Sequence, residues 1–165
     1  MKHQLDQVTL TFSSRSANEG FARAVAACFA AQLDPTLDEV NDIKTAVSEA
    51  VTNCIVHAYR GANPDTSFVY ISVRLYDSRE ITVEISDNGC GIPSERIERI
   101  FTGYNDKTDN ASDTQTRNAG IGLSVCATIV KAHGGDITAE NARGGGAVFR
   151  FSLTTEDALD EQKQI

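Results

Sequence analysis

The chain has 165 residues, of which 41% are hydrophobic and 7% aromatic, and its formal net charge is −8. This length and composition are typical of one globular domain that buries a core without disulfides, and the acidic balance argues against a nucleic-acid surface. No apolar run reaches the length of a membrane span and the start of the chain lacks a signal-peptide pattern, so we expect a cytoplasmic protein.

The N-terminal third of the sequence predicts one strand and two helices. Apolar and polar residues alternate over residues 7–13, which indicates a strand. A capping box that begins at Ser16 predicts a helix to about Gln32. A second capping box begins at Thr36 and predicts a longer helix that ends near Gly61.

A β-hairpin follows in the middle of the chain. Residues 69–75 and 81–85 both alternate apolar with polar, and a polar turn separates them. The same alternation puts Asp87 on the apolar face, which we expect helices to cover, so this carboxylate needs a hydrogen-bond donor. A short helix is predicted over residues 93–100.

The last third of the sequence begins with an unusually long polar segment. Residues 102–119 contain almost no large apolar side chain, and polar loops of this length are often active-site lids. A helix is predicted over 120–132, and strands are predicted over 137–139 and 149–153. The acidic tail, residues 154–165, lacks apolar periodicity and is expected to fray.

Together these elements predict an α+β fold in a single domain over residues 1–153. Hairpins dominate and the helices come in blocks, so we expect a two-layer α/β sandwich. In it, three main helices pack on one face of a mostly antiparallel, mixed sheet of four or five strands.

The long helix that begins near Thr36 carries two different stripes. One is apolar, and the other consists of Glu49, Asn53 and His57, spaced four residues apart. Glu49 and Asn53 lie about one turn apart, roughly 6 Å along the axis. A carboxylate there can deprotonate a hydroxyl, and an amide oxygen can be one of the few protein ligands of Mg²⁺. A solvated polar helix face is the alternative interpretation, and His57 is assigned only to packing at the rim.

A second candidate site is the D-x-G-x-G sequence formed by Asp87, Gly89 and Gly91. The glycines permit positive φ angles and a close approach of a ligand to the backbone. A simple strand-to-helix turn would have the same pattern. It is not a dinucleotide fingerprint, because no third glycine follows at the required spacing.

A third candidate is the G-x-G sequence at the predicted start of the last helix, residues 120–122. Glycines at a helix N-terminus expose backbone N–H groups to a phosphate, although they could also serve only to begin the helix. Lys107 and Arg117 precede it and could reach a terminal phosphate, although most basic residues in loops have no such role. The four cysteines form no C-x-x-C pair, so a zinc site is not indicated.

In chain order, these patterns resemble the N, G1 and G2 boxes of the ATPase superfamily shared by gyrase, Hsp90, histidine kinases and MutL, the GHKL or Bergerat fold. The resemblance covers residues 38–153. The closing stretch, HGGDITAENARGGGAVFRFSL, looks like that of a histidine-kinase catalytic domain, with Asn141 and Ala147 where Ser and Thr are common. Residues 18–59 are similar to the anti-sigma F factor family of sporulating bacteria.

The resemblance implies a serine protein kinase that binds a sigma factor, phosphorylates an anti-anti-sigma protein with ATP and Mg²⁺, and works as a homodimer. It makes Glu49 the catalytic base, Asn53 the Mg²⁺ ligand and Asp87 the acceptor for the adenine amino group. Arg117 would approach the γ-phosphate, but it lies one residue further from its glycine than in the family, and the lid is longer. The ATP- or ADP-binding set implied in this way is Asn53, Asp87, Gly89, Gly91, Lys107, Arg117, Gly120, Ile121, Gly122 and Leu123.

Two other functions remain open from the sequence. The first is a free-standing histidine-kinase domain that phosphorylates a histidine in another protein, because neither His57 nor His133 is followed by an acid. The second is a module that binds nucleotide and a sigma factor without transfer. A gyrase- or MutL-type ATPase is favoured least. The N-terminal strand is the candidate for pairing between the two chains of a dimer.

Overall fold

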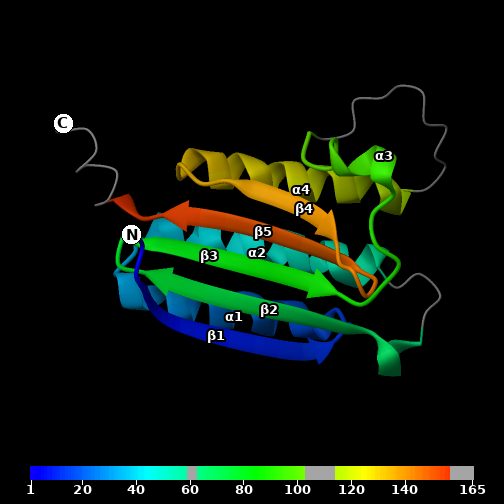
Figure 1. Cartoon of the computed structure of the whole chain (residues 1–165), viewed down its shortest axis with the longest axis horizontal. Helices are drawn as coiled ribbons and strands as arrows, with labels where there is room; N and C mark the ends of the chain where they lie inside the picture. The colour runs from blue at the N-terminus through cyan, green and yellow to red at the C-terminus, as the bar shows by residue number, and fades with distance from the viewer. Residues whose placement is uncertain (59–62, 103–113, 157–165) are drawn as a thin grey trace.

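The computed structural model describes residues 1–58, 63–102 and 114–156, with only the backbone described at Pro64 and at residues 114–120. Figure 1 shows one five-stranded sheet with the strand order β1-β2-β3-β5-β4. Every neighbouring pair is antiparallel, so the expectation of a mixed sheet is wrong. The strands are β1 (Gln4–Ser13), β2 (Phe68–Tyr76), β3 (Glu80–Asp87), β4 (Ile137–Asn141) and β5 (Ala147–Thr154).

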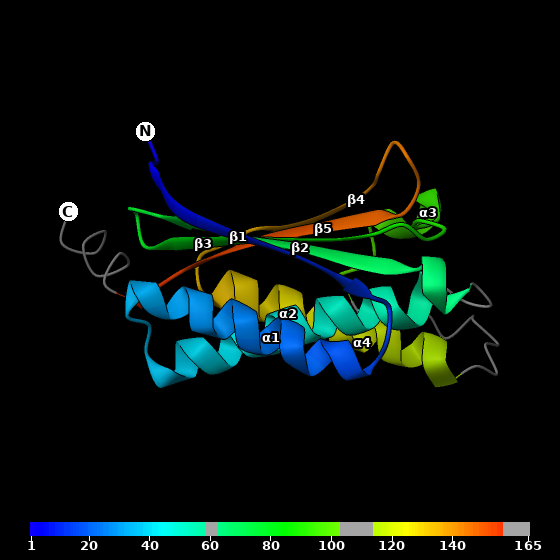
Figure 2. The ribbon, with the colours of Figure 1, turned by 90° about the horizontal axis from the view of Figure 1, so that it is seen from below.

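Three long helices form the second layer. They are α1 (Ala17–Ala30), α2 (Leu37–His57) and α4 (Thr114–Ala132), and Figure 2 shows all three on the same side of the sheet. Helix α2 packs against both α1 and α4. The predicted two-layer α+β sandwich is therefore confirmed. The short helical segments are α3 (Ser94–Ile97) and the 3₁₀ turns Ala31–Leu33 and Pro64–Thr66.

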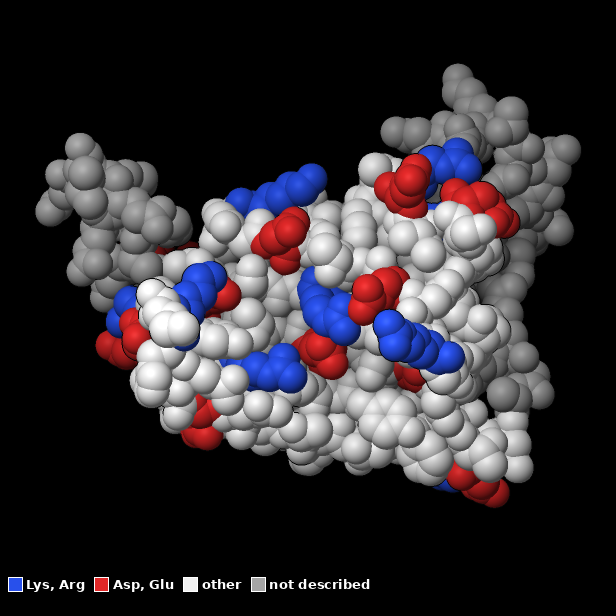
Figure 3. Space-filling view, viewed as in Figure 1, with Lys and Arg blue, Asp and Glu red and all other residues white. Residues whose placement is uncertain are grey.

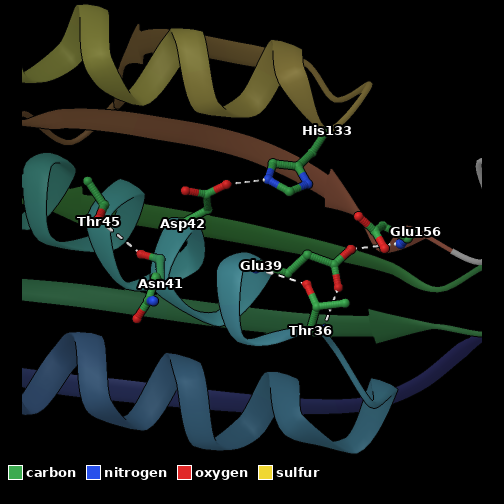
Figure 4. Close-up of polar contacts among 7 residues, drawn as sticks. All are labelled: Thr36, Glu39, Asn41, Asp42, Thr45, His133 and Glu156. Carbon is green, nitrogen blue, oxygen red and sulfur yellow. Dashed lines mark hydrogen bonds and ion pairs between the residues drawn. The ribbon is translucent and has the colours of Figure 1, made fainter.

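Helix α2 begins where its sequence predicts. The Thr36 hydroxyl accepts a hydrogen bond from the Glu39 backbone N–H (3.3 Å), and the Glu39 carboxylate accepts one from the Thr36 N–H (2.7 Å; Figure 4). Such a reciprocal cap satisfies two N–H groups that would otherwise have no intrahelical partner. The predicted apolar stripe faces the sheet, and each of its members is at most 2% exposed: Ile43, Val47, Ala50, Val51 and Cys54.

The opposite face of the sheet is not covered by the described helices (Figures 1 and 2). Figure 3 shows that it carries interspersed positive and negative side chains. Arg150 of β5 illustrates the pattern, because its guanidinium pairs with Glu84 of β3 (2.7 Å) and with Glu140 of β4. The apolar residues of the same strands point to the helices, as their alternation predicts.

Helix α1 begins where the sequence predicts, because Ser16 is its N-cap residue, but Ser16 makes no side-chain cap hydrogen bond, and the Glu19 carboxylate accepts one from the Ser48 hydroxyl of α2. Two sequence predictions about element boundaries are wrong. Helix α4 begins at Thr114 rather than at Gly120, so the end of the predicted loop 102–119 is helical. The predicted helix over 93–100 is only the single turn α3.

The expectation that the chain frays from Thr154 is also wrong for the residues that are described. Thr154 belongs to β5, and Thr155 is 2% exposed. The Glu156 N–H then donates to the second carboxylate oxygen of Glu39 (2.7 Å), which ties this segment to the start of α2 (Figure 4). Residues 157–165 lie outside the described part of the chain.

Candidate active site

Two helices meet at the first candidate residue, Glu49. It is half-buried on α2 and faces Gly122 of the neighbouring helix α4. A Cβ atom at position 122 would lie 3.3 Å from Glu49 Cδ and closer still to Oε2. The missing side chain of Gly122 therefore allows this carboxylate to lie directly against α4.

The surroundings of Glu49 are partly apolar. Cys126, one turn after Gly122 on α4, is completely buried and its thiol donates to the Ala46 carbonyl oxygen (3.6 Å). Burial, and then the negative charge of Glu49, raise the pKa of the Cys126 thiol to about 12. At neutral pH this thiol is therefore protonated, and Glu49 provides the negative charge at this point of the α2–α4 contact.

The second candidate, Asp87, ends β3 and is 5% exposed. Its Oδ1 accepts hydrogen bonds from the Gly89 N–H (2.9 Å) and the Ala147 N–H (3.2 Å). The pKa of the neighbouring Cys54 thiol is raised by burial, by the charge of Asp87 and by a hydrogen bond to that carboxylate. The prediction of a buried carboxylate that needs donors is thus confirmed, and the chain itself supplies two backbone N–H donors. A carboxylate accepts about four hydrogen bonds, which leaves acceptor capacity for a further donor.

The glycine-containing loop after Asp87 lies close to other parts of the chain, and one of its two glycines has the predicted positive φ. A Cβ atom at Gly89 would lie 2.9 Å from the carbonyl carbon of Ala58, just past the end of α2. The Cys90 N–H donates to the Ala58 carbonyl oxygen (3.3 Å), so the loop is joined to α2. Gly91 has a φ of 77°, and a Cβ there would lie 2.7 Å from the Asn141 amide oxygen.

Other predicted residues are placed differently or fall outside the description. Because α4 begins at Thr114, the predicted helix N-terminus at Gly120 is wrong, and Gly122 lies in the helix interior. Ile121 is 58% exposed, whereas Leu123 belongs to the core. Lys107 lies outside the described residues, and of Arg117 and Gly120 only the helical backbone is described.

The remaining polar residues of α2 continue the line of Glu49. Asn53 and His57 are both half-buried and follow Glu49 at one-turn intervals towards the glycine loop. Nearer the start of α2, Asp42 pairs with His133 (2.7 Å; Figure 4).

Among the described residues, no group of three or more His, Cys, Asp or Glu could hold a metal ion. The described helices include none that is long and apolar enough to cross a membrane.

No pattern in the sequence marks Asn141 as a residue of this candidate site. The sequence alone distinguishes Asn141 only because the histidine-kinase family often has serine at that position. Its contact with Gly91 depends on residues far apart in the chain, so no local pattern could have predicted it.

The four cysteines differ in exposure. Cys54 and Cys126 are buried, whereas Cys28 and Cys90 are exposed.

Comparison with known sequences identifies one family over most of the chain. The sequence model of the "Histidine kinase-, DNA gyrase B-, and HSP90-like ATPase" family matches residues 38–157. The anti-sigma F factor of Clostridium botulinum (strain Alaska E43 / Type E3) is 43% identical over 126 residues, which are 76% of this chain and 80% of that protein. The anti-sigma F factor of Caldanaerobacter subterraneus subsp. tengcongensis is 38% identical over 89% of this chain and 92% of that protein.

Comparison with solved structures gives the same fold. The catalytic domain of histidine kinase ThkA superimposes with a TM-score of 0.55 and 18% identity, covering 92% of this chain and 99% of that one. The mycobacterial sensor histidine kinase MprB gives a TM-score of 0.54 and 20% identity over 71% of this chain and 74% of that one. At these identities the likeness concerns the fold alone.

Proposed function

The chain belongs to the family of histidine kinase-, DNA gyrase B- and HSP90-like ATPases and, within it, to the anti-sigma F factors, and from this we propose a specific activity. The protein is an ATP-dependent anti-sigma factor that binds a sigma factor in the cytoplasm. It also transfers phosphate from ATP to a serine of an anti-anti-sigma protein. The observation that carries the proposed transfer is the half-buried Glu49 carboxylate at the contact between α2 and α4.

Nucleotide recognition is assigned to Asp87 and the loop that follows it. The remaining acceptor capacity of the buried Asp87 carboxylate suits the amino group of adenine, which is a hydrogen-bond donor. The internal donors keep this carboxylate in one orientation, so little ordering is needed when the base binds. The Gly89 N–H donates to the same carboxylate, so the backbone of the glycine loop lies beside it.

Asn53 is assigned to the metal ion. Asn53 follows Glu49 by one turn of α2, and its amide oxygen is a hard oxygen ligand of the kind that Mg²⁺ accepts. The lack of a ready-made cluster of ligands among the described residues is in keeping with a magnesium ion held mainly by phosphates and water. When bound, the ion would neutralise charge on the phosphates.

Glu49 is assigned to the acceptor hydroxyl. It orients the serine hydroxyl and accepts its proton while the serine oxygen bonds to the γ-phosphorus and ADP leaves. Gly122 lets the carboxylate keep this place beside α4. We assign the dimer contact to the outer edge of β1, which pairs with no further strand among the described residues.

The test is a phosphotransfer assay with radiolabelled ATP, Mg²⁺ and candidate anti-anti-sigma proteins. We expect acid-stable label on the partner, loss of transfer in Glu49→Gln, and unchanged transfer in Glu84→Gln, which changes a carboxylate on the opposite sheet face. Acid-labile label would instead indicate a histidine kinase. If no phosphate is transferred while the sigma factor still binds, the protein is a binding module without kinase activity. Normal ATP binding by Asp87→Asn would overturn the assignment of the pocket.

A further inference from the structure

The side chain of Asn141 is bonded to the glycine loop at two points. Its Oδ1 accepts the Ile92 backbone N–H (2.7 Å), and its Nδ2 donates to the Ile92 carbonyl oxygen (2.8 Å). The amide therefore binds both polar groups of one residue, as a neighbouring strand would. Asn141 ends β4, so these bonds fix one end of the loop to the β4–β5 hairpin.

The conformation of Gly91 fits this contact. Its φ of 77° lies in the left-handed region, and a Cβ atom would lie 2.7 Å from the Asn141 Oδ1. A side chain at this position would thus be strained and would displace the asparagine. The second glycine of the D-x-G-x-G sequence makes room for a protein side chain.

The other end of the loop is held by the same hairpin. Ala147 pairs with Asn141 across β4 and β5, and its backbone N–H donates to Asp87 Oδ1 (3.2 Å). The hairpin itself is closed by the Ala142 N–H, which donates to the Gly146 carbonyl oxygen (2.9 Å). Two paired residues therefore bind Asp87 and Ile92, the first and last residues of the loop.

We propose that Asn141 is a positioning residue of the nucleotide site, which holds the Gly91–Ile92 backbone in a fixed place relative to the Asp87 carboxylate. This inference rests on the proposed function. Asn141 acts through the loop and touches no substrate. Without its two bonds, the far end of the loop must be ordered each time a nucleotide binds, which weakens affinity. Since Glu49 belongs to α2, whereas Asn141 acts on the loop after β3, the rate at saturating ATP is unaffected.

The test measures ADP and ATP affinity by titration calorimetry, and KM and kcat for phosphotransfer, in matched variants. Asn141→Ala should weaken nucleotide binding about tenfold and raise KM for ATP without lowering kcat. The control is Asn18→Ala, which removes an asparagine side-chain bond to backbone far from the glycine loop, the one from Asn18 Nδ2 to the carbonyl oxygen of Ser13 at the end of β1 (2.8 Å). This control should lose a similar amount of stability and bind nucleotide normally.

A second variant guards against misfolding. Asn141→Asp keeps the size of the side chain and the acceptor for the Ile92 N–H but loses the donor, and should also weaken binding. Hydrogen exchange at the Ile92 amide should be slow in the wild type and faster in Asn141→Ala.

Normal affinity in both Asn141 variants would overturn the inference, and so would an equal loss of affinity in Asn18→Ala. These outcomes apply when the wild type binds nucleotide and Asp87→Asn does not. If the wild type binds no nucleotide, or Asp87→Asn binds it normally, the proposed function itself is wrong.

Discussion

Replacement of Gly122 by alanine separates the stability of the fold from the placement of the Glu49 carboxylate, which we propose as the catalytic base. The new methyl group would lie 3.3 Å from Glu49 Cδ and closer to Oε2. The carboxylate is the far end of a flexible side chain, so it can move away, by about 1 Å, without disturbing the core. A misplacement of about 1 Å in a catalytic group costs about 100-fold in rate.

The same substitution should not destabilise the protein. Gly122 lies inside α4, where alanine is favoured over glycine by about 1 kcal/mol. We therefore expect unfolding in urea to show equal or higher stability, whereas phosphotransfer to the anti-anti-sigma protein falls about 100-fold. The loss should lie in kcat more than in nucleotide affinity, because Asp87 and its donors are untouched.

Gly20→Ala is the matched control. Gly20 lies in α1, and the nearest atom to a Cβ there would be Arg23 Nη2 at 4.0 Å. This variant should gain stability by up to about 1 kcal/mol and keep its full activity. If Gly122→Ala transfers phosphate at the wild-type rate while Glu49→Gln is inactive, the close contact between the two residues has no role in catalysis and the reasoning fails.

Three further predictions concern buried groups. In the native protein, a thiol reagent should modify Cys28 and Cys90, whereas it should modify Cys54 and Cys126 only after unfolding. Bound nucleotide should slow the modification of Cys90. Labelling followed by mass spectrometry distinguishes the four thiols. The folded pKa of Cys126 lies above its unfolded value of 9.0, so stability is lost as pH rises from 9 towards 12. Urea unfolding at pH 8 and pH 10 should therefore show a loss smaller by about 1.4 kcal/mol in Cys126→Ala than in the wild type, and equal losses would contradict it. Glu39→Ala should lower the unfolding free energy by about 2–3 kcal/mol, because the two backbone N–H groups that donate to this carboxylate lose their acceptor. A change of less than about 0.5 kcal/mol, as is usual for a surface site, would show that the two N–H groups bind another acceptor.

Local signals predicted α2 correctly because two of them coincide there. The reciprocal cap of Thr36 and Glu39 marks the start of the helix, and the apolar stripe follows in register. The similar pattern at Ser16 correctly predicts the start of α1, because Ser16 is its N-cap residue, but no side-chain cap bond forms there. The Glu19 carboxylate instead accepts a hydrogen bond from the Ser48 hydroxyl of α2, a tertiary contact that a sequence window does not contain.

The start of α4 was missed for a different reason. The residues from Thr114 to Gly120 carry no large apolar side chain, so hydrophobic periodicity cannot detect a helix there. Glycine also lowers helix propensity by about 1 kcal/mol, which made the G-x-G sequence look like a helix boundary. In the structure, Gly122 instead lies inside α4, and its missing side chain leaves the space that the Glu49 carboxylate occupies. A tertiary contact, which no sequence window contains, accounts for the glycine here.

The glycines of the site consequently have a common role that the motif alone does not reveal. Gly89 accommodates the end of α2, Gly91 accommodates Asn141, and Gly122 accommodates Glu49. In each case a protein group occupies the space that a side chain would fill. Each glycine thus permits a close contact between two parts of the candidate site. Under the proposed function, a side chain at position 89 or 91 would shift the loop beside Asp87, and one at position 122 would shift the Glu49 carboxylate, even where the glycine itself does not touch the nucleotide.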